Sequence, residues 1–268
     1  MIKIFALVLL VGWFCLERVL KKDFSKYYAY VFGKKIFLRY NRFLYQLSLC
    51  GMGILNYQNP YLFGEKGWLK NYLANKEKPT ILDVGANRGE YSRAILTITP
   101  RARILAFEPH PITFNVLKKA IHFEGFTAYN LGVGDKHEKL EIYDYDNKDG
   151  SAHASLYKEV IEDLHKGTAI SHTVQVVALD EFLKEKEIDT VDLLKIDTEG
   201  HELSALMGAK SYLSNNKVKA IHFEFNEMNI ISKVRFKDFW DMLPNYDFYR
   251  LLPGGGRVPI RHYTPHLL

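Results

Sequence analysis

Residues Ile81-Leu82-Asp83-Val84-Gly85-Ala86-Asn87-Arg88-Gly89 define the architecture expected of this chain. A short apolar run ends at Asp83 and is followed by Gly85 and a turn of small residues. Glu90 then opens a pattern typical of a helix. Together these features predict a strand, a tight turn and a helix, with the backbone exposed at the turn. In open α/β sheets such turns lie at the carboxyl end of a parallel strand, where ligands bind.

The glycine spacing in this turn argues against a pyrophosphate ligand. A dinucleotide-binding turn has the pattern G-x-G-x-x-G, whose second glycine lets the backbone approach the phosphates. Here Asn87 stands at that second position, and Gly89 follows two residues later. The chain also lacks the G-x-x-x-x-G-K-[ST] pattern of a P-loop. The turn therefore fits a nucleoside cofactor without phosphates, with Gly85 allowing close approach and Asp83 attracting a cationic amine.

An acidic residue follows the second apolar run, Arg103 to Phe107. This residue, Glu108, lies 25 positions after Asp83, about the length of one β-α-β step. An acidic side chain at this strand end can accept hydrogen bonds from both ribose hydroxyls. A solvated glutamate after a buried strand is the plainer alternative, but the glycine turn at this distance favours ribose binding. Residues Ile112 to Phe123 then show an amphipathic helical pattern.

Three motifs in the same order make the chain resemble a known family. They are Asp83-Val84-Gly85-Ala86-Asn87-x-Gly89, Phe107-Glu108-Pro109 and Leu194-Lys195-Ile196-Asp197-Thr198-Glu199-Gly200-x-Glu202. Over residues 80–252 the chain resembles the FkbM family of S-adenosylmethionine-dependent methyltransferases. The resemblance implies an α/β class I methyltransferase fold, which is Rossmann-like: a doubly wound, mostly parallel seven-stranded sheet. It also implies S-adenosyl-L-methionine as the cofactor and transfer of a methyl group, most often to a hydroxyl.

We expect the first two motifs and the end of a third strand to hold this cofactor. Residues Thr127 to Asn130 are typical of that third strand. The amide and the glycine-relaxed backbone that end it can hydrogen-bond the adenine edge, although a plain turn is the alternative. The expected cofactor-binding residues are Asp83, Gly85, Ala86, Asn87, Gly89, Glu108, Pro109, Asn130 and Gly132.

The third motif is expected to carry the chemistry. Residues Val191 to Ile196 have the pattern of a buried parallel strand, expected next to the first strand. Asp197 would then stand at the carboxyl tip of that strand, beside the reactive methyl. Glu202 would begin a helix that runs to about Leu213. Helix capping by Asp197 or Thr198 is the alternative, and it can coexist with a role in the site.

Methyl transfer to a hydroxyl benefits from a base that takes the hydroxyl proton. Asp197 is the first candidate, and Glu224 is the second because burial at the end of the next apolar run would raise its pKa. The expected catalytic residues are Asp197, Glu224, Glu199 and His201. Alternatively, Asp197 and Glu199 would ligate a Mg²⁺ ion that orients a diol. Nothing in the sequence selects that ion and no histidine pair has metal-ligand spacing, so no metal is predicted.

The first 60 residues differ in character from the rest. Ile4 to Leu16 is almost entirely apolar, and basic and aromatic residues follow it. As a helix this run would be about 20 Å long, shorter than the roughly 30 Å hydrocarbon core of a bilayer. Two interpretations stay open: a helical cap packed on the catalytic domain, and membrane association through residues 1–45. No cleavage-site pattern supports a signal peptide, and the basic flank would keep the catalytic domain at the cytoplasmic face of a membrane.

We therefore expect an N-terminal helical extension over residues 1–60 and a methyltransferase domain over residues 61–268. Within this domain, Lys139 to Tyr145 and Thr173 to Val177 predict two strands. They would form a hairpin insertion around residues 136–178 that covers the site. Residues Phe236 to Leu252 are expected to supply a helix and a strand that close the sheet.

Composition narrows the classes of function. A net charge of +5 is too small to imply nucleic acid as a partner, and the two cysteines lack metal or redox spacing, which favours the cytoplasm. The predicted function is methylation of a hydroxyl on a sugar, a glycan or a related small metabolite. The basic aromatic N-terminus favours a glycan or lipid-linked acceptor. The alternatives are a nicotinamide-dependent oxidoreductase and a catalytically silent membrane-associated scaffold with the same fold. The sequence makes no prediction of oligomeric state.

Overall fold

The structure is a computed structural model that describes residues 24–54, 64–145, 158, 168–226 and 228–264. The chain divides into two compact units, Met1–Phe63 and Gly64–Leu268. The predicted apolar run Ile4 to Leu16 lies outside the described residues. So does nearly all of the loop that joins the two predicted hairpin strands.

The described residues of the first unit form two α-helices joined by a short 3-10 helix. They are α2 Phe24–Phe32, η1 Lys35–Phe37 and α3 Leu38–Gly51. The ring of Phe32 contacts three neighbouring aromatic rings. The side chain of Asn41 also donates a 2.8 Å hydrogen bond to the carbonyl of Phe32, so the two α-helices are linked. Among the described helices, none is long and apolar enough to cross a membrane.

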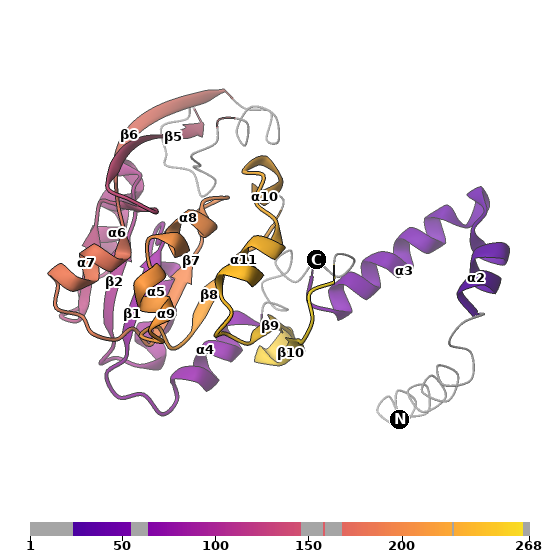
Figure 1. Cartoon of the computed structure of the whole chain (residues 1–268), viewed down its shortest axis with the longest axis horizontal. Coiled ribbons are helices and arrows are strands. Elements are labelled where there is room, and N and C mark those ends of the chain that lie inside the picture. Colours follow the sequence, from indigo (N-terminus) through magenta and orange to yellow (C-terminus); the bar gives the residue numbers. More distant parts are fainter. Residues whose placement is uncertain (1–23, 55–63, 146–157, 159–167, 227, 265–268) are drawn as a thin grey trace. The chain divides into compact units, whose positions relative to one another are not determined.

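The core of the second unit is a sheet of five strands in the order β3-β2-β1-β7-β8, in which all neighbours run parallel (Figure 1). The strands are β1 Thr80–Val84, β2 Arg103–Phe107, β3 Phe126–Tyr129, β7 Leu193–Ile196 and β8 Ile221–Phe223. The chain first builds outward from β1 to β3 and later adds β7 and β8 on the other side of β1. The strand order therefore reverses between β1 and β7, which is where open α/β sheets bind ligands.

Helices cover both faces of this sheet, because successive side chains of a strand point to opposite faces. Ile81 packs against α4 and α5, whereas its neighbour Leu82 faces the core shared with α7, α8, α9 and α11. The helices are α4 Glu65–Leu73, α5 Glu90–Ile98, α6 Pro111–Ala120, α7 Leu179–Glu185, α8 Glu202–Met207, α9 Lys210–Ser214, α10 Met228–Ile231 and α11 Phe236–Met242. The predicted doubly wound, mostly parallel α/β fold is confirmed.

A three-stranded sheet stands apart from the main one. Strands β5, Glu138–Tyr145, and β6, Ala169–Val177, form an antiparallel pair in the region of the expected insertion. The two-residue strand β4, Gly132–Val133, lies parallel to the end of β6. The pair extends away from the main sheet at the top of Figure 1. One of its faces carries a small cluster of buried apolar side chains.

The expectation of seven strands in one sheet is not met: in the described residues the main sheet has five. Strand β9, Phe248–Leu251, does not close it, and pairs instead with β10, Arg257–Ile260, in an antiparallel sheet of two. The 3-10 helix η4, Pro253–Gly255, turns the chain between them, with Gly254 at a φ of 75°. This tight turn brings the next segment alongside β9 at once, so the two strands pair with each other.

The helix expected from Glu202 to about Leu213 is interrupted. Helix α8 ends at Met207, and α9 begins at Lys210. Gly208 lies between them, packed so closely that a Cβ atom there would stand 1.9 Å from the carbonyl oxygen of Gly134. The carbonyl of Gly208 accepts a 2.7 Å hydrogen bond from the backbone N–H of Asp180. These contacts outside the helix replace the hydrogen bonds that would continue it.

The packing at Gly208 makes a prediction about stability. The Gly208→Ala variant should lose about 2–3 kcal/mol of unfolding free energy, because the added methyl overpacks a backbone contact. Gly256→Ala is the matched control, since a Cβ at Gly256 meets only ordinary contacts at 3.5 Å. Urea unfolding followed by circular dichroism compares the two variants. Equal midpoints for them would contradict the close contact at Gly208.

Candidate active site

The turn after β1 and the tip of β7 are in direct contact. In the parallel register Asp83 lies opposite Lys195, and the N–H of Asp197 donates a 3.0 Å hydrogen bond to the carbonyl of Val84. Gly85 has a φ of 73°, and a Cβ atom there would stand 1.7 Å from the carbonyl oxygen of Asp197. Only glycine fits this position. Gly85 of the first motif therefore allows the backbone of the third motif to pack directly against the turn.

A cavity opens at this junction and encloses about 770 Å³ of space continuous with solvent. Eight of the residues predicted from the sequence line it: Gly85, Asn87, Glu108, Pro109, Gly132, Asp197, Glu199 and His201. The structure thus brings together the ends of β1, β2 and β7 and the start of β4 around one space.

Glu108 lies in the wall of this cavity and is almost fully buried. One carboxylate oxygen accepts a 2.8 Å hydrogen bond from the N–H of Asn87, and the other accepts one of 2.9 Å from the N–H of His110. Burial raises the pKa of Glu108 to about 7, although these two N–H donors oppose the shift. Each oxygen keeps a second lone pair, so the carboxylate can still accept hydrogen bonds from a diol.

Asp83 is not where we expected it. Its side chain is fully buried and is not part of the cavity lining; it accepts a 2.5 Å hydrogen bond from Ser92 and lies 3.7 Å from the ammonium of Lys195. The reason is the alternation of side chains along β1, which turns Asp83 toward Ser92 of α5, whereas its neighbour Val84 lines the cavity. In this structure Asp83 therefore acts on the neighbouring Lys195 rather than facing a ligand.

Three other predicted cofactor residues lie beside the cavity without lining it. Ala86 is buried in the core next to α6. Gly89 has a φ of 81° at the start of α5, and a Cβ there would stand 2.7 Å from Leu117. The amide of Asn130 donates hydrogen bonds to the carbonyls of Glu108 and Pro109. These residues shape the loops that form the cavity.

The hairpin that we expected over the site supplies apolar lining residues that sequence reasoning did not name individually. Ile142 of β5 and Val174 and Val176 of β6 line the cavity, together with Leu131 and Val133. The alternation of apolar and polar residues in β5 predicted one buried face. Alternation cannot say what that face covers, because the pairing of this hairpin with β4 is not encoded in its own pattern. The hairpin thus adds apolar side chains to a cavity that Glu108 and Asp197 also line.

The carboxylates of Asp197 and Glu224 are hydrogen-bonded to each other. Asp197 lines the cavity, and Glu224 follows the end of β8 just behind it. Burial opposes ionisation of Asp197, but the charge of Lys195 and the hydrogen bond from Glu224 outweigh it and lower the pKa of Asp197. Burial and the charge of Asp197 raise the pKa of Glu224 to about 8. The pair therefore shares one proton near neutral pH.

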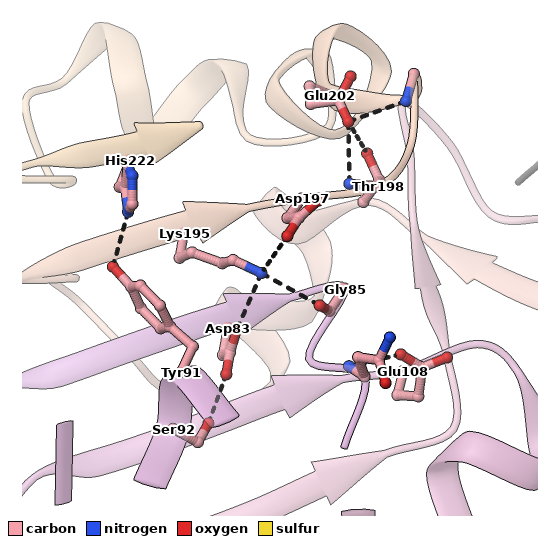
Figure 2. A network of polar contacts seen from close by, with 12 residues as sticks. Asp83, Gly85, Tyr91, Ser92, Glu108, Lys195, Asp197, Thr198, Glu202 and His222 are labelled. Atoms are coloured by element: carbon pink, nitrogen blue, oxygen red, sulfur yellow. Dashed lines mark hydrogen bonds and ion pairs between the residues drawn. The ribbon is translucent and has the colours of Figure 1, made fainter. Parts of the chain in front are cut away.

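A buried lysine, Lys195, joins Asp197 to Gly85 and Asp83 (Figure 2). The ammonium of Lys195 lies 3.2 Å from a carboxylate oxygen of Asp197 and donates a 3.2 Å hydrogen bond to the carbonyl of Gly85. Asp83 stands on its other side. The sequence did hold a signal: a lysine inside an apolar strand has to find a partner when it is buried. Its partner could be named only once the register of β1 and β7 was known.

Aromatic and histidine side chains line the far side of this lysine. The ring of Tyr91 lies 5.5 Å from the ammonium, and its hydroxyl is 3.0 Å from Nδ1 of His222 (Figure 2). Burial and the charge of Lys195 lower the pKa of His222 to about 4, so this ring is neutral. Glu65, at the start of α4, faces the same group, and burial raises its pKa to about 7.

The loop after Asp197 is fixed by a carboxylate of the next helix. One oxygen of Glu202 accepts hydrogen bonds from the N–H and hydroxyl of Thr198 and from the N–H of Gly200, at 3.0–3.1 Å. The other oxygen accepts one from Asn229. Glu199, between these donors, has a φ of 53°. Glu202 thus holds the backbone of this motif in place and does not face the cavity.

His201 also lines the cavity, but it lies away from the carboxylate pair. Its Nε2 atom is 3.1 Å from the position that a Cβ of Gly134 would take, near β6 and α8. Burial lowers its pKa, which keeps the ring neutral. Among the described residues, no group of three or more His, Cys, Asp or Glu side chains could hold a metal ion.

Comparison with known proteins identifies the family. A family model described as the methyltransferase FkbM domain matches residues 83–249. The chain belongs to the FkbM methyltransferase family. It is therefore a methyltransferase, and its cofactor is S-adenosylmethionine, as in that family.

The chain is also similar to individual named methyltransferases. It is 25% identical to the 2-O-methyltransferase NoeI of Sinorhizobium fredii over 71% of this chain and 82% of that protein. It is 30% identical to the methyltransferase sdnD of Sordaria araneosa over 48% and 60% of the two chains. It is 27% identical to the hexuronic acid methyltransferase AglP of Haloferax volcanii over 63% and 64%. The match thus spans less than two thirds of the last two proteins.

The residues of the cavity fit the family's cofactor. Gly85 exposes backbone at the floor, Glu108 offers two carboxylate oxygens to a ribose, and Asp197 offers a negative charge. The apolar wall of Ile142 and Val176 suits a flat base. No cation lines the cavity among the described residues, which suits a positively charged sulfonium better than a phosphate.

Glu108 gives a direct test of cofactor binding. The Glu108→Gln variant should bind S-adenosylmethionine roughly ten- to a hundredfold more weakly, because charge-assisted hydrogen bonds are worth about 1.5–3 kcal/mol. Isothermal titration calorimetry measures the affinity. Glu124→Gln, at an exposed position, serves as the control and should bind as the wild type does. An unchanged affinity in Glu108→Gln would remove the ribose contact.

Proposed function

We propose that this protein methylates a hydroxyl group of a sugar, with the Asp197–Glu224 carboxylate pair as the base. The observation that carries the proposal is the contact between these two side chains at the wall of the cavity. Asp197 lines the space, and the hydrogen bond to Glu224 couples their titration. Two carboxylates that share a proton near neutral pH form a base of suitable strength for proton abstraction from a hydroxyl.

The chemistry requires alignment first and proton removal second. When bound, S-adenosylmethionine supplies a methyl group on a positively charged sulfur: the C–O bond to the acceptor forms as the C–S bond breaks, and its electron pair stays on sulfur. Holding the reacting atoms in line provides the larger part of the rate. Asp197 would accept the hydrogen bond of the acceptor hydroxyl and orient it. The proton then passes to the Asp197–Glu224 pair, which later returns it to solvent.

The choice of a sugar as acceptor draws on the relatives. One is named as a 2-O-methyltransferase and another as a hexuronic acid methyltransferase. Carboxylates at the cavity wall suit a hydroxyl-rich acceptor, since they accept its hydrogen bonds. Incubating the protein with methyl-labelled cofactor and a panel of neutral, amino and uronic sugars or glycans tests this. Label that enters only non-sugar metabolites would contradict the proposal.

The alternative functions are weaker. Membership of a methyltransferase family argues against a nicotinamide-dependent oxidoreductase. A catalytically silent scaffold is disfavoured because Gly85, Glu108 and Asp197 meet around one cavity. Cofactor binding without transfer to any acceptor of the panel would favour the scaffold instead.

We also propose that the N-terminal unit contacts a membrane surface, with the catalytic unit at the cytoplasmic face. In the described helices of this unit, apolar and aromatic side chains are exposed next to basic ones. The exposed apolar residues are Tyr27, Tyr30, Val31, Ile36, Leu38, Tyr40, Phe43, Tyr45 and Leu47, and the basic ones are Lys26, Lys34, Lys35, Arg39 and Arg42. This combination favours binding to anionic lipid. Co-sedimentation with anionic and neutral vesicles measures it, and equal binding to both would contradict the electrostatic part.

Two substitutions test the base. Asp197→Ala and Glu224→Gln should each lower kcat by about 10²–10⁴-fold, which is the usual contribution of a general base. Asp189→Asn, at an exposed carboxylate paired with Lys217, is the control and should keep the wild-type rate. Initial rates at saturating cofactor provide the comparison. If Asp197→Ala binds S-adenosylmethionine and turns over like the wild type, the assignment is wrong.

The pH dependence follows from the raised pKa of Glu224. Below about pH 8 Glu224 holds the proton of the pair, so the base is not available. The value of kcat/KM should therefore rise about tenfold per pH unit toward pH 8 and level off above it. Measuring kcat/KM from pH 5.5 to 10 tests whether the rate rises in this way. A rate that stays flat between pH 6 and 8, or falls there, would contradict the proposed base.

A further inference from the structure

Lys195 is placed to control both halves of the site. Its side chain is only 9% exposed, and three oxygen atoms surround its ammonium group. These are a carboxylate oxygen of Asp197 at 3.2 Å, the carbonyl of Gly85 at 3.2 Å and a carboxylate oxygen of Asp83 at 3.7 Å. Gly85 belongs to the turn that lines the cofactor cavity, and Asp197 belongs to the carboxylate pair. One ammonium therefore fixes the position of the base relative to the turn.

The charges around the carboxylate pair are mostly negative. From the described residues, the ionisable acids that face it are Asp83 of β1, Glu65 of α4, Glu199 of the loop after β7, and the pair itself. His222 of β8 is kept neutral by burial and by Lys195. Burial first, with the charges of Glu65 and Asp83, raises the pKa of Tyr91 of α5, so its hydroxyl is protonated. Within this set of groups, Lys195 therefore carries the positive charge that lies next to Asp197.

We propose that Lys195 is a positioning residue of the methyl transfer, which holds Asp197 beside the cofactor turn and stabilises the fully ionised Asp197–Glu224 pair. The catalytic meaning of this inference rests on the proposed function, because the ionised pair is the form that takes the acceptor proton. Its electrostatic part concerns this chain alone and needs neither acceptor nor cofactor.

Loss of the ammonium has a defined consequence. Two carboxylates in contact repel each other when both are ionised, and a nearby cation offsets that repulsion. Without Lys195 the pair should hold its last proton to higher pH. A purely structural role would lower stability or activity at every pH and leave the titration of the pair where it was.

The test follows the last proton of the pair in the cofactor-free protein. Carboxyl carbons of glutamate are labelled with ¹³C, and the Glu224 signal is identified by its loss in Glu224→Gln. In the wild type this carboxyl should titrate near pH 8, as burial and Asp197 dictate. In Lys195→Met the midpoint should move up by about one pH unit or more, the usual effect of an adjacent charge. The control Lys217→Met, at a lysine paired with Asp189 on the surface, should titrate as the wild type does.

A second variant keeps the test open if Lys195→Met does not fold. Asp83→Asn keeps the shape of the side chain but removes the carboxylate that competes for Lys195. The midpoint of Glu224 should then move down, opposite to the effect of removing the lysine. Thermal unfolding and the amide spectrum establish that each variant is folded. An unmoved midpoint in folded Lys195→Met, or an upward shift in Asp83→Asn, would overturn the proposal.

The two proposals fail in different ways. If the Glu224 midpoint moves as expected but no sugar is methylated, the role of Lys195 in the carboxylate pair stands and the assigned acceptor falls. If sugars are methylated and the midpoint does not move in Lys195→Met, the proposed function stands and the role of Lys195 falls. The rate gives a further readout: Lys195→Met should lose at least tenfold in kcat at pH 7 and recover part of it at pH 9–10, following the shifted titration.

Discussion

The contact between the buried ammonium of Lys195 and two aspartates is the interaction on which the rest of the site depends. The parallel register of β1 and β7 sets Asp83 opposite Lys195, and Asp197 follows two residues later at the strand tip. Removing one partner of such a buried pair typically costs about 3–5 kcal/mol, because the remaining charge is left without compensation. The pairing of β1 with β7 therefore places these charges together, and their attraction in turn stabilises that pairing. A one-residue slip would turn the lysine to the other face of the sheet.

From that junction the cavity is built in two chemically different halves. The polar half consists of strand ends, where Gly85, Glu108 and Asp197 present backbone and carboxylates. The apolar half comes from the hairpin of β5 and β6, which packs its buried face over the same space. A cofactor with a charged end and a flat base matches this division. The fold thus supplies orientation along the cavity before any acceptor arrives.

Much of this fold could be predicted from the sequence, since the strong signals are local. The strand Arg103–Phe107 matches the predicted range residue for residue, and the strand at Leu193–Ile196 lies next to the first strand as expected. Those predictions depend on apolar runs, glycines and chain order. The strand at Phe248–Leu251 was expected to close the main sheet, but it pairs with Arg257–Ile260 instead. The two possible partners compete, and the tight turn after the strand favours the one next to it in the chain. The residue pattern of a single strand does not show which of two possible partners it pairs with.

The site shows the same division between local and nonlocal information. Gly85 and Glu108 could be named because a turn and a strand end suffice to place them at a sheet edge. Asp83 was expected to contact the cofactor, but its buried side chain contacts Ser92, since whether a side chain at the strand end faces a ligand or a helix depends on packing. The significance of Lys195 requires the register between strands 110 residues apart. The partners of charges buried inside apolar strands are thus the features that are hardest to predict from the sequence alone.

The proposed function depends most on which atom receives the methyl group. The most direct measurement uses S-adenosylmethionine with a ¹³C-labelled methyl group and follows the product formed with a sugar acceptor by NMR. We expect a carbon signal of a methyl ether, with the label on a single sugar oxygen. A labelled methyl on nitrogen, carbon or sulfur, formed at a comparable rate, would contradict it.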